Sequence, residues 1–240
     1  MLSLSVVIIT FNEEKRIEKC ISAVQSLADE IVVIDSFSTD KTKNICEKYG
    51  VRFIQREWTN FGDAKRFAVQ QATHNYILSL DADEVVSTKL KNTIQDTKAN
   101  WVADAYHFNR LTFVGDKPIR HGGWYPDSKI RLFDRRKANW TNVPVHETVV
   151  PTTKNCVVRH LQGDLLHYSY ENIDELMHSP KHKLYTNMYS QKKKLNKIFL
   201  YLKCAFTFVK TYLFRLGFLD GKSGWAVAVS GIKYTYSKYS

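Results

Sequence analysis

Residues 76–84 read Tyr-Ile-Leu-Ser-Leu-Asp-Ala-Asp-Glu, a short apolar run that ends in three carboxylates. A run of this kind predicts a buried β-strand, which holds its carboxyl end rigidly. Alternate residues of an extended chain point to the same side, so Asp81 and Asp83 are expected together. Adjacent carboxylates repel each other unless a cation lies between them, and their oxygens suit Mg²⁺ or Mn²⁺. The motif predicts a site for a metal ion and a diphosphate; the alternative is an acidic turn before a helix beginning at Ser87-Thr88.

The sequence before this motif alternates between strand and helix patterns. β-Branched and apolar runs predict strands at residues 4–10, 30–35, 51–55 and 76–80. Helical spacing predicts helices at residues 12–28, with Asn12 as the cap, at 40–48 and at 62–73. This rhythm predicts an α/β fold: a Rossmann-like, mainly parallel sheet flanked by helices.

Polar residues gather where the predicted strands end. Thr10, Asn12 and Glu13 follow the first strand, and Asp35 and Asp40 follow the second. Ligands of parallel sheets bind beyond the carboxyl ends of the strands, so these groups are candidate ligand contacts. The carboxylate of Asp35 could accept a hydrogen bond from a base or a ribose; helix capping is the alternative for both acids. The chain lacks the glycine-rich fingerprints of dinucleotide oxidoreductases and of P-loop NTPases, which disfavours both classes.

The charge of the chain is unevenly distributed. The net charge is +11, and residues 181–240 hold 12 Lys and Arg but a single acid, Asp220. The remaining 180 residues hold 23 basic and 23 acidic residues (35 − 12 and 24 − 1). We therefore predict a neutral domain at 1–180 and a basic, helical extension at 181–240.

The cysteines predict no metal site. Cys20, Cys46, Cys156 and Cys204 show no CxxC spacing, and no secretory signal precedes the first strand. Both features favour ordinary buried thiols in the reducing cytoplasm.

Residues 198–219 form an apolar stretch long enough to cross a bilayer. Crossing would place Lys203 and Lys210 in hydrocarbon at a cost of about 2.5–3.5 kcal/mol each. These lysines share one helical stripe with Thr207 and Thr211. We predict an amphipathic helix lying on an anionic membrane surface; the alternative is a helix packed on the catalytic domain with a solvated charged stripe.

Three segments resemble the family-two glycosyltransferases, inverting enzymes with the GT-A fold. They are Val-Val-Ile-Ile-Thr-Phe-Asn-Glu-Glu (6–14), Glu-Ile-Val-Val-Ile-Asp-Ser-Phe-Ser-Thr-Asp (30–40) and Leu-Ser-Leu-Asp-Ala-Asp-Glu (78–84). Segments 121–127, 131–133, 145–147, 166–170 and 217–221 are similar to the bacterial lipopolysaccharide-core subgroup. The resemblance covers nearly the whole chain. It implies Mg²⁺- or Mn²⁺-dependent transfer of a sugar, often glucose, from a nucleotide-diphosphate sugar to a lipid-linked glycan at the cytoplasmic face of the inner membrane.

The resemblance also implies roles for individual residues. It places the nucleoside against Thr10, Asn12, Glu13 and Asp35, and the metal ion and diphosphate against Asp81 and Asp83. Lys65 is a candidate contact for a phosphate or the base edge, and a solvated helix lysine is the alternative. His167, in the apolar-flanked run 164–168, is a candidate to complete metal or diphosphate binding, and a core histidine is the alternative. Trp124, in a Gly-Gly loop, is a candidate for a sugar contact. Many relatives read Gln-Lys-Asn where this chain has Ala64-Lys-Arg66, which leaves the contact near residue 66 open.

An inverting transfer requires a carboxylate that takes the proton of the acceptor hydroxyl. The carboxylate must face the side opposite the leaving diphosphate, which disfavours Asp81 and Asp83. We predict Glu147 as this base, with Asp127 in reserve and His146 as a group that orients Glu147. The metal ion would neutralise the departing diphosphate.

Two other enzymatic functions stay open: loading of a polyprenyl phosphate, and synthesis of capsule or exopolysaccharide. A basic nucleic-acid-binding protein is the non-enzymatic alternative. Nucleic acid is not the expected partner, because the long apolar runs between the lysines suit lipid better than a nucleic-acid groove.

Overall fold

The computed structural model describes residues 2–143, 146–179 and 195–240, and the chain divides into two compact units. Unit 1 comprises Met1–Arg110 and Ser128–His167, and unit 2 comprises Leu111–Asp127 and Tyr168–Ser240. The sequence predicted a boundary at residue 180 instead. The division differs because hydrogen bonds tie residues 120–122 to residues 215 and 220.

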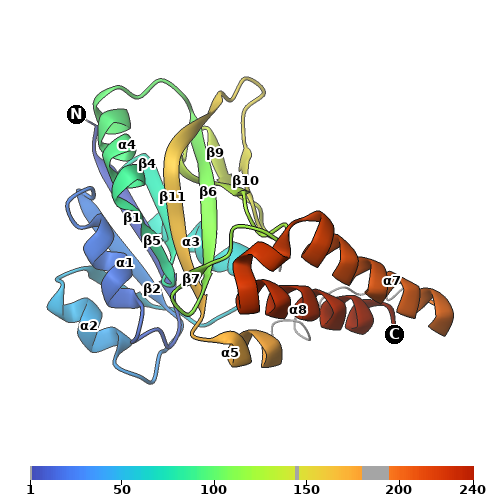
Figure 1. Cartoon of the computed structure of the whole chain (residues 1–240). Helices are drawn as coiled ribbons and strands as arrows, with labels where there is room; N and C mark the ends of the chain where they lie inside the picture. Colours follow the sequence, from blue (N-terminus) through green and yellow to red (C-terminus); the bar gives the residue numbers. More distant parts are fainter. Residues whose placement is uncertain (1, 144–145, 180–194) are drawn as a thin grey trace. The chain divides into compact units, whose positions relative to one another are not determined.

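Unit 1 is built on a mixed sheet with the strand order β3-β2-β1-β4-β8-β6-β11-β5 (Figure 1). The strands are β1 (Leu4–Thr10), β2 (Glu30–Asp35), β3 (Arg52–Gln55), β4 (Tyr76–Asp81), β5 (Glu84–Val86), β6 (Ala105–Val114), β8 (Asp127–Asp134) and β11 (Val158–Tyr170). The first four in this order pair in parallel, as the sequence predicted. Beyond β4 the sheet turns antiparallel, through the β4–β8 and β11–β5 pairs.

Short strands complete the β-structure. β7 (Lys117–Pro118) pairs with the end of β6. β9 (Ala138–Trp140) and β10 (Val149–Pro151) pair antiparallel in a small sheet of their own. Trp140 and Val149 from this small sheet join the same apolar cluster as the third helix of unit 1.

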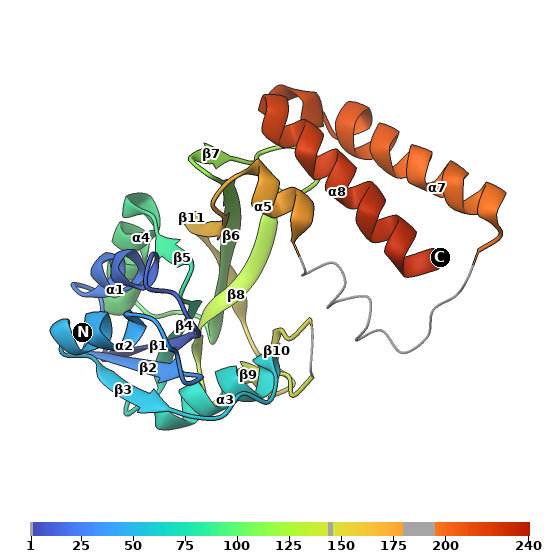
Figure 2. The same ribbon diagram turned by 90° about the horizontal axis from the view of Figure 1, so that it is seen from below.

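Helices cover both faces of the parallel strands (Figures 1 and 2). They are α1 (Ile17–Val24), α2 (Thr42–Lys48), α3 (Phe61–Gln71) and α4 (Thr88–Ala99). Side chains of β1 alternate between two clusters: Leu4, Val6 and Ile8 pack with α1, α2 and α4, and Val7 and Ile9 pack with α3. All seven residues of β1 are buried, because both faces of this strand are covered.

The first helix begins later than predicted. Asn12 was expected to cap it, but α1 starts at Ile17 and Asn12 has a φ of 52°. The side-chain oxygen of Asn12 instead accepts the N–H of Thr39, so this residue holds the loop beyond β2. Ser87 does cap α4, with its Oγ accepting the N–H of Leu90, so the acids at 81–84 are not needed for that purpose.

Unit 2 contains helical elements from the C-terminal part of the chain. They are α5 (Ile173–His178), α7 (Lys197–Val209), the π-helical turn η1 (Lys210–Phe214), the 3₁₀ turn η2 (Gly217–Asp220) and α8 (Gly221–Tyr239). Helices α7 and α8 lie side by side (Figures 1 and 2). Val114, Ile119, Leu176, Ala226 and Val227 form a small apolar cluster. Within the three ranges that the structure describes, no helix has both the length and the hydropathy needed to cross a bilayer.

Candidate functional site

The carboxyl ends of the parallel strands bring polar residues to one edge of the sheet. In the register of the strands, Thr10 of β1 lies beside Asp35 of β2, and Ile9 lies beside Asp81 of β4. This edge is where ligands of α/β sheets bind.

Lys65 joins two of the predicted acids at this edge. Its Nζ lies 2.8 Å from Glu147 Oε1 and 2.9 Å from Asp81 Oδ1, and only 2% of its side chain is exposed. Lys65 comes from the buried face of α3, and Glu147 precedes β10. The structure therefore assembles three of the predicted site residues from segments 16 and 82 residues apart.

Arg131 of β8 completes the cluster from the other side of Asp81. Its Nη2 lies 3.1 Å from Asp81 Oδ2 and 2.7 Å from Glu84 Oε1, and the Glu84 side chain is fully buried. Glu84 Oε2 also accepts the backbone N–H of Asp81 at 3.0 Å. Burial alone would raise the pKa of Asp81, but the Lys65 ammonium and the Arg131 guanidinium outweigh it and hold that pKa well below its usual range.

Trp140 supports both cations of this cluster. The Lys65 Nζ lies 4.6 Å and the Arg131 guanidinium 5.0 Å from the centre of a Trp140 ring. The indole N–H donates to Ser79 Oγ at 3.1 Å, which fixes the orientation of the buried ring. Cation–π contacts of this kind stabilise cations that have lost their water.

Three buried polar atoms at this edge lack a well-directed hydrogen bond within the described part of the chain: Thr10 Oγ1, Asp81 Oδ1 and Arg131 Nε. Asp81 Oδ1 lies 2.9 Å from Lys65 Nζ, which is an ion contact. The hydrogen bond from Lys65 goes to the other carboxylate oxygen, Oδ2, at 3.2 Å. Buried polar atoms without hydrogen bonds are uncommon and costly in folded proteins. Their position at the ligand edge of the sheet fits a polar ligand.

Asp83 and His167 form a separate pair. Asp83 Oδ2 lies 3.2 Å from His167 Nε2, because the antiparallel pairing of β11 with β5 sets His167 opposite Glu84. A carboxylate and an imidazole suit Mn²⁺, and the carboxylate also suits Mg²⁺. Among the described residues no group of three or more His, Cys, Asp or Glu could hold a metal ion. The pair therefore fits a metal ion only if substrate phosphates and water supply the other ligands.

The acids that follow β2 hold their own loop. Asp35 is fully buried, and its carboxylate accepts hydrogen bonds from Ser38 and, at 3.1 Å, from Gln55 Nε2. A contact with a nucleoside, as the sequence predicted, would require this side chain to move. Asp40 Oδ1 accepts the N–H of Thr42, the first residue of α2, at 2.9 Å, although the N-cap position itself is Lys41. This contact favours the capping alternative for Asp40.

The other predicted residues are dispersed. Glu13 lies 3.0 Å from Arg16 Nη1, and His146, beside Glu147 in the chain, has a φ of 59°. Trp124 and Asp127 belong to unit 2, where Trp124 packs against the small apolar cluster and Asp127 begins β8. Their predicted roles stay predictions.

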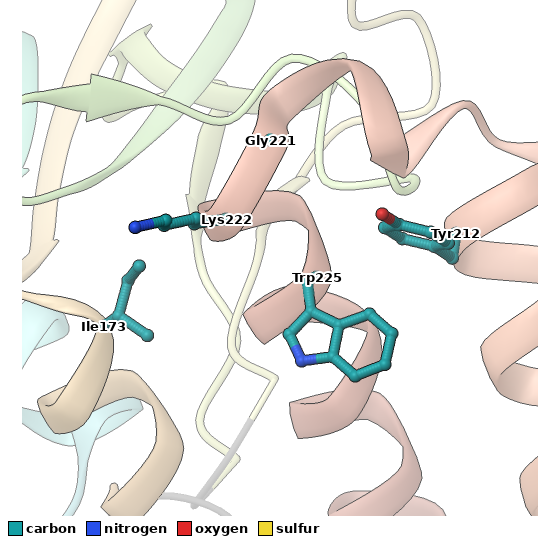
Figure 3. Close-up of a pocket in the computed structure, with 5 residues that line it drawn as sticks. All are labelled: Ile173, Tyr212, Gly221, Lys222 and Trp225. Atoms are coloured by element: carbon teal, nitrogen blue, oxygen red, sulfur yellow. The ribbon is translucent and has the colours of Figure 1, made fainter.

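Unit 2 has a hollow of about 390 Å³ that the sequence did not indicate (Figure 3). It is lined by Ile173, Tyr212, Gly221, Lys222 and Trp225. The rings of Tyr212 and Trp225 lie 5.6 Å apart at 88°. Aromatic faces beside an ammonium can hold a sugar ring that carries an anionic group.

Sequence reasoning assigned no role to Arg131, Glu84 or Trp140. One signal was present for Arg131, which stands in the apolar run Ile130-Arg-Leu-Phe133. A buried arginine in a strand needs a carboxylate partner, but the sequence does not indicate that Glu84, 47 residues away, is that partner. Trp140 gave no local signal, because an aromatic residue in a strand most often belongs to the core.

Comparison with known proteins identifies the family of the chain. Residues 5–152 match the family described as Glycosyl transferase family 2. The lipopolysaccharide core biosynthesis glycosyltransferase LpsC of Rhizobium meliloti is 30% identical over 98% of this chain and 90% of LpsC. The uncharacterized glycosyltransferase RT0209 of Rickettsia typhi is 28% identical over 100% of this chain and 85% of that protein. Among solved structures, S. aureus TarS 1–349 in complex with UDP is similar with a TM-score of 0.40 and 26% identity, over 47% of this chain and 36% of that chain.

The sheet and the sequence match lead to one assignment. A parallel β3-β2-β1-β4 half followed by antiparallel strands, with helices on both faces, is a GT-A arrangement, although the sheet is mixed where the sequence predicted a mainly parallel one. The matched region covers more than half of the 240 residues and includes Lys65, Asp81, Arg131 and Glu147. The chain belongs to glycosyl transferase family 2 and is a glycosyltransferase.

Proposed function

We propose that this enzyme transfers a sugar, with inversion, from a nucleotide-diphosphate sugar to a hydroxyl of a lipid-linked glycan such as lipopolysaccharide core. The observation that carries the proposal is the cluster in which Lys65 joins Asp81 and Glu147 at the carboxyl edge of the sheet. It supplies a cation for a leaving diphosphate and a carboxylate for an attacking hydroxyl within one buried group.

Glu147 is proposed as the base. Its carboxylate takes the proton of the acceptor hydroxyl while that oxygen bonds to the anomeric carbon, and the bond from this carbon to the diphosphate breaks. In the present structure Lys65 neutralises Glu147 at 2.8 Å. Diphosphate oxygens of the donor would compete for the same ammonium and release Glu147 from Lys65. To act as the base, the released Glu147 carboxylate would then turn to the side opposite the diphosphate, where the acceptor hydroxyl attacks.

Asp83 and His167 are proposed to hold Mg²⁺ or Mn²⁺ on the diphosphate side. Such an ion, when bound, neutralises the charge that develops on the leaving diphosphate. Arg131 and Lys65 keep Asp81 ionised and fix its position, and Thr10 Oγ1 lies at the same edge for the donor.

The acceptor class rests on similarity to LpsC, which is named for lipopolysaccharide core biosynthesis. Glucose is our proposal for the transferred sugar, and the inner-membrane face is our proposal for the location. Loading of polyprenyl phosphate and synthesis of capsule or exopolysaccharide are the competing acceptors. The aromatic hollow of unit 2 supports a sugar-containing acceptor, since Trp225 and Tyr212 offer ring faces beside Lys222.

The experiment is a donor screen with UDP-, GDP- and ADP-sugars, followed by transfer to lipid-linked acceptors extracted from bacterial membranes. We expect Mn²⁺-dependent turnover of one donor, loss of turnover in EDTA and a product whose anomeric configuration is inverted, read by NMR. An Asp83→Asn variant with intact fold is the matched inactive control. Retention of configuration, or full turnover in EDTA, would contradict the proposed chemistry, and a labelled polyprenol as product would select the competing acceptor.

A further inference from the structure

Helix α7 has its apolar residues on the outside. The residues that it buries are Leu200 and Cys204, and Thr207 contacts Thr235 of α8 through their hydroxyls at 3.3 Å. The residues that it exposes, by 58–69% each, are Ile198, Phe199, Tyr201, Leu202 and Phe206. The sequence predicted Thr207 on one stripe with Lys203 and Lys210, and in the structure this threonine contacts the neighbouring helix. A helix at a water-facing surface has the opposite arrangement, with polar residues outward.

The exposed apolar surface continues past the end of α7. In η1 and η2, Leu213, Phe214, Leu216, Phe218 and Leu219 are all exposed, Phe214 by 72%. We call the exposed apolar residues between 198 and 219 the apolar face. Ten large apolar residues exposed within 22 positions are unusual on a soluble monomer, where apolar surface that gathers in one region marks a contact with another apolar phase.

The charges around the apolar face have one sign. Residues 195–240 contain seven basic residues, which are Lys197, Lys203, Lys210, Arg215, Lys222, Lys233 and Lys238. Lys203 and Lys210 are seven residues apart, two helical turns, so they follow one edge of the face. The only acid in this range, Asp220, is bonded to His121 Nδ1 at 2.8 Å and to two backbone N–H groups. Lys203 Nζ lies 3.8 Å from the centre of the Tyr239 ring, and Lys233 Nζ donates to the backbone oxygen of Met177 at 2.8 Å, so these two lysines also have contacts within unit 2. The segment combines exposed apolar side chains with a net positive charge.

We propose that the apolar face is the docking surface of the enzyme for an anionic lipid bilayer, with α7 lying in the plane of the interface. Phe, Leu and Ile side chains would enter the acyl boundary while the lysines reach the headgroups. A helix in this position buries its apolar side to a depth of about 5–10 Å without crossing the bilayer. The proposal goes beyond glycosyl transfer and does not depend on which donor or acceptor the enzyme uses.

A second copy of the chain is the less suitable occupant. A two-fold interface sets a surface against its own copy, so a basic apolar surface would meet a second surface of the same charge. Like charges brought together in a buried interface are costly. Anionic headgroups satisfy both the apolar residues and the lysines.

The test is flotation of the full chain with vesicles made of equal parts phosphatidylglycerol and phosphatidylcholine, compared with pure phosphatidylcholine vesicles. We expect binding to the anionic vesicles that weakens at high salt, and much weaker binding to the neutral ones. A Phe199→Ser/Phe206→Ser/Phe214→Ser variant should lose at least about tenfold in partitioning. Lys203→Gln/Lys210→Gln should lose about fivefold per lysine, from anionic vesicles only.

A Val102→Ser/Val157→Ser variant is the matched control, because both valines are exposed apolar residues of unit 1. It should float like the unchanged protein. All substituted side chains are exposed, and an unchanged thermal unfolding transition would verify the fold of each variant. Three results would overturn the proposal. They are equal binding to both vesicle types, unchanged vesicle binding by the phenylalanine variant, and a shift from dimer to monomer in that variant. Vesicle binding is measured without donor or acceptor. A loss of vesicle binding would therefore contradict the docking surface and leave the proposed reaction untouched.

Discussion

The ammonium of Lys65 lies 2.8 Å from Glu147 and 2.9 Å from Asp81, and the lysine side chain is almost fully buried. Two carboxylates that would otherwise repel each other are thereby held on either side of one cation. The geometry makes Lys65 the residue on which both the stability of the cluster and the charge state of the site depend.

Replacing Lys65 with methionine should lower the free energy of unfolding by about 3 kcal/mol. This value is the lower end of the range for breaking a buried ion pair, because Arg131 still neutralises Asp81 in the variant. Urea unfolding followed by circular dichroism measures this change. Lys43→Met is the control, since Lys43 lies 3.9 Å from Glu47 on an exposed helix face, and its loss should cost less than about 1 kcal/mol. Equal losses in the two variants would mean that the buried cluster does not stabilise the fold.

Glu147→Gln should lower kcat by about 10²–10⁴-fold and leave donor affinity nearly unchanged. The amide oxygen of glutamine can still accept from Lys65, so the fold is expected to persist. Steady-state kinetics and calorimetric titration of the donor separate the two effects, with exposed Glu47→Gln as the control. A parallel Asp127→Asn variant decides between the two candidate bases: a larger loss of kcat there would transfer the role to Asp127.

His167→Ala should weaken Mn²⁺ binding by about tenfold or more, because the imidazole lies 3.2 Å from Asp83. Electron paramagnetic resonance of free Mn²⁺ measures how much Mn²⁺ the protein binds in the presence of donor, independently of enzymatic activity. His160→Ala provides the control from the same strand, since His160 is exposed on β11 and its ring lies 4.9 Å from that of His107. Unchanged Mn²⁺ affinity in His167→Ala would remove this histidine from the metal site.

Stability should fall at acid pH in part through Glu30. Burial raises the pKa of Glu30, but hydrogen bonds from Ser5 and Thr73 outweigh this and lower it below its ordinary 4.5. A lowered pKa in the folded state contributes stability that is fully present above 4.5 and is lost as the pH falls below it. The urea midpoint should therefore decline below about pH 4.5, and less steeply in Glu30→Gln. Identical pH dependence in the variant would show that Glu30 contributes nothing to it.

Asp220→Ala should loosen residues 120–122 of unit 2, because the carboxylate accepts the N–H groups of Arg120 and His121 and pairs with the His121 ring. Hydrogen bonds to charged groups contribute about 1.5–3 kcal/mol each. Amide hydrogen exchange should speed up in this loop and stay unchanged in β1 and β4 of unit 1. The exposed Asp116, substituted with alanine, serves as the control. Unchanged protection in the loop would show that other contacts hold it.

Local sequence patterns predicted the parallel half of the sheet well. The strands at 4–10, 30–35 and 76–80 were confirmed within one residue, because β-branched and apolar runs of strand length allow few other structures. The first helix was wrong at its start, since the predicted cap Asn12 adopts a positive φ and binds a loop 27 residues away. No pattern within residues 12–28 contains that partner.

The antiparallel half of the sheet was largely missed. β8 pairs with β4 across 54–58 residues, and residues 111–127 belong to the same compact unit as the C-terminal helices. Such pairings depend on which surfaces remain uncovered after the parallel half has formed. A local pattern does not record that information.

The sequence by itself determined that acids would stand at the end of a buried strand, and that positive charge and apolar residues would share the C-terminal segment. Both follow from composition over a few residues, where propensity and periodicity act. The tertiary structure alone decided that Lys65 and Arg131 would contact Asp81, that Asp35 would accept hydrogen bonds from Ser38 and Gln55, and that α7 would expose Phe199 and Phe206. These outcomes depend on contacts between distant segments, because a buried charge takes whichever partner the packed fold brings within reach.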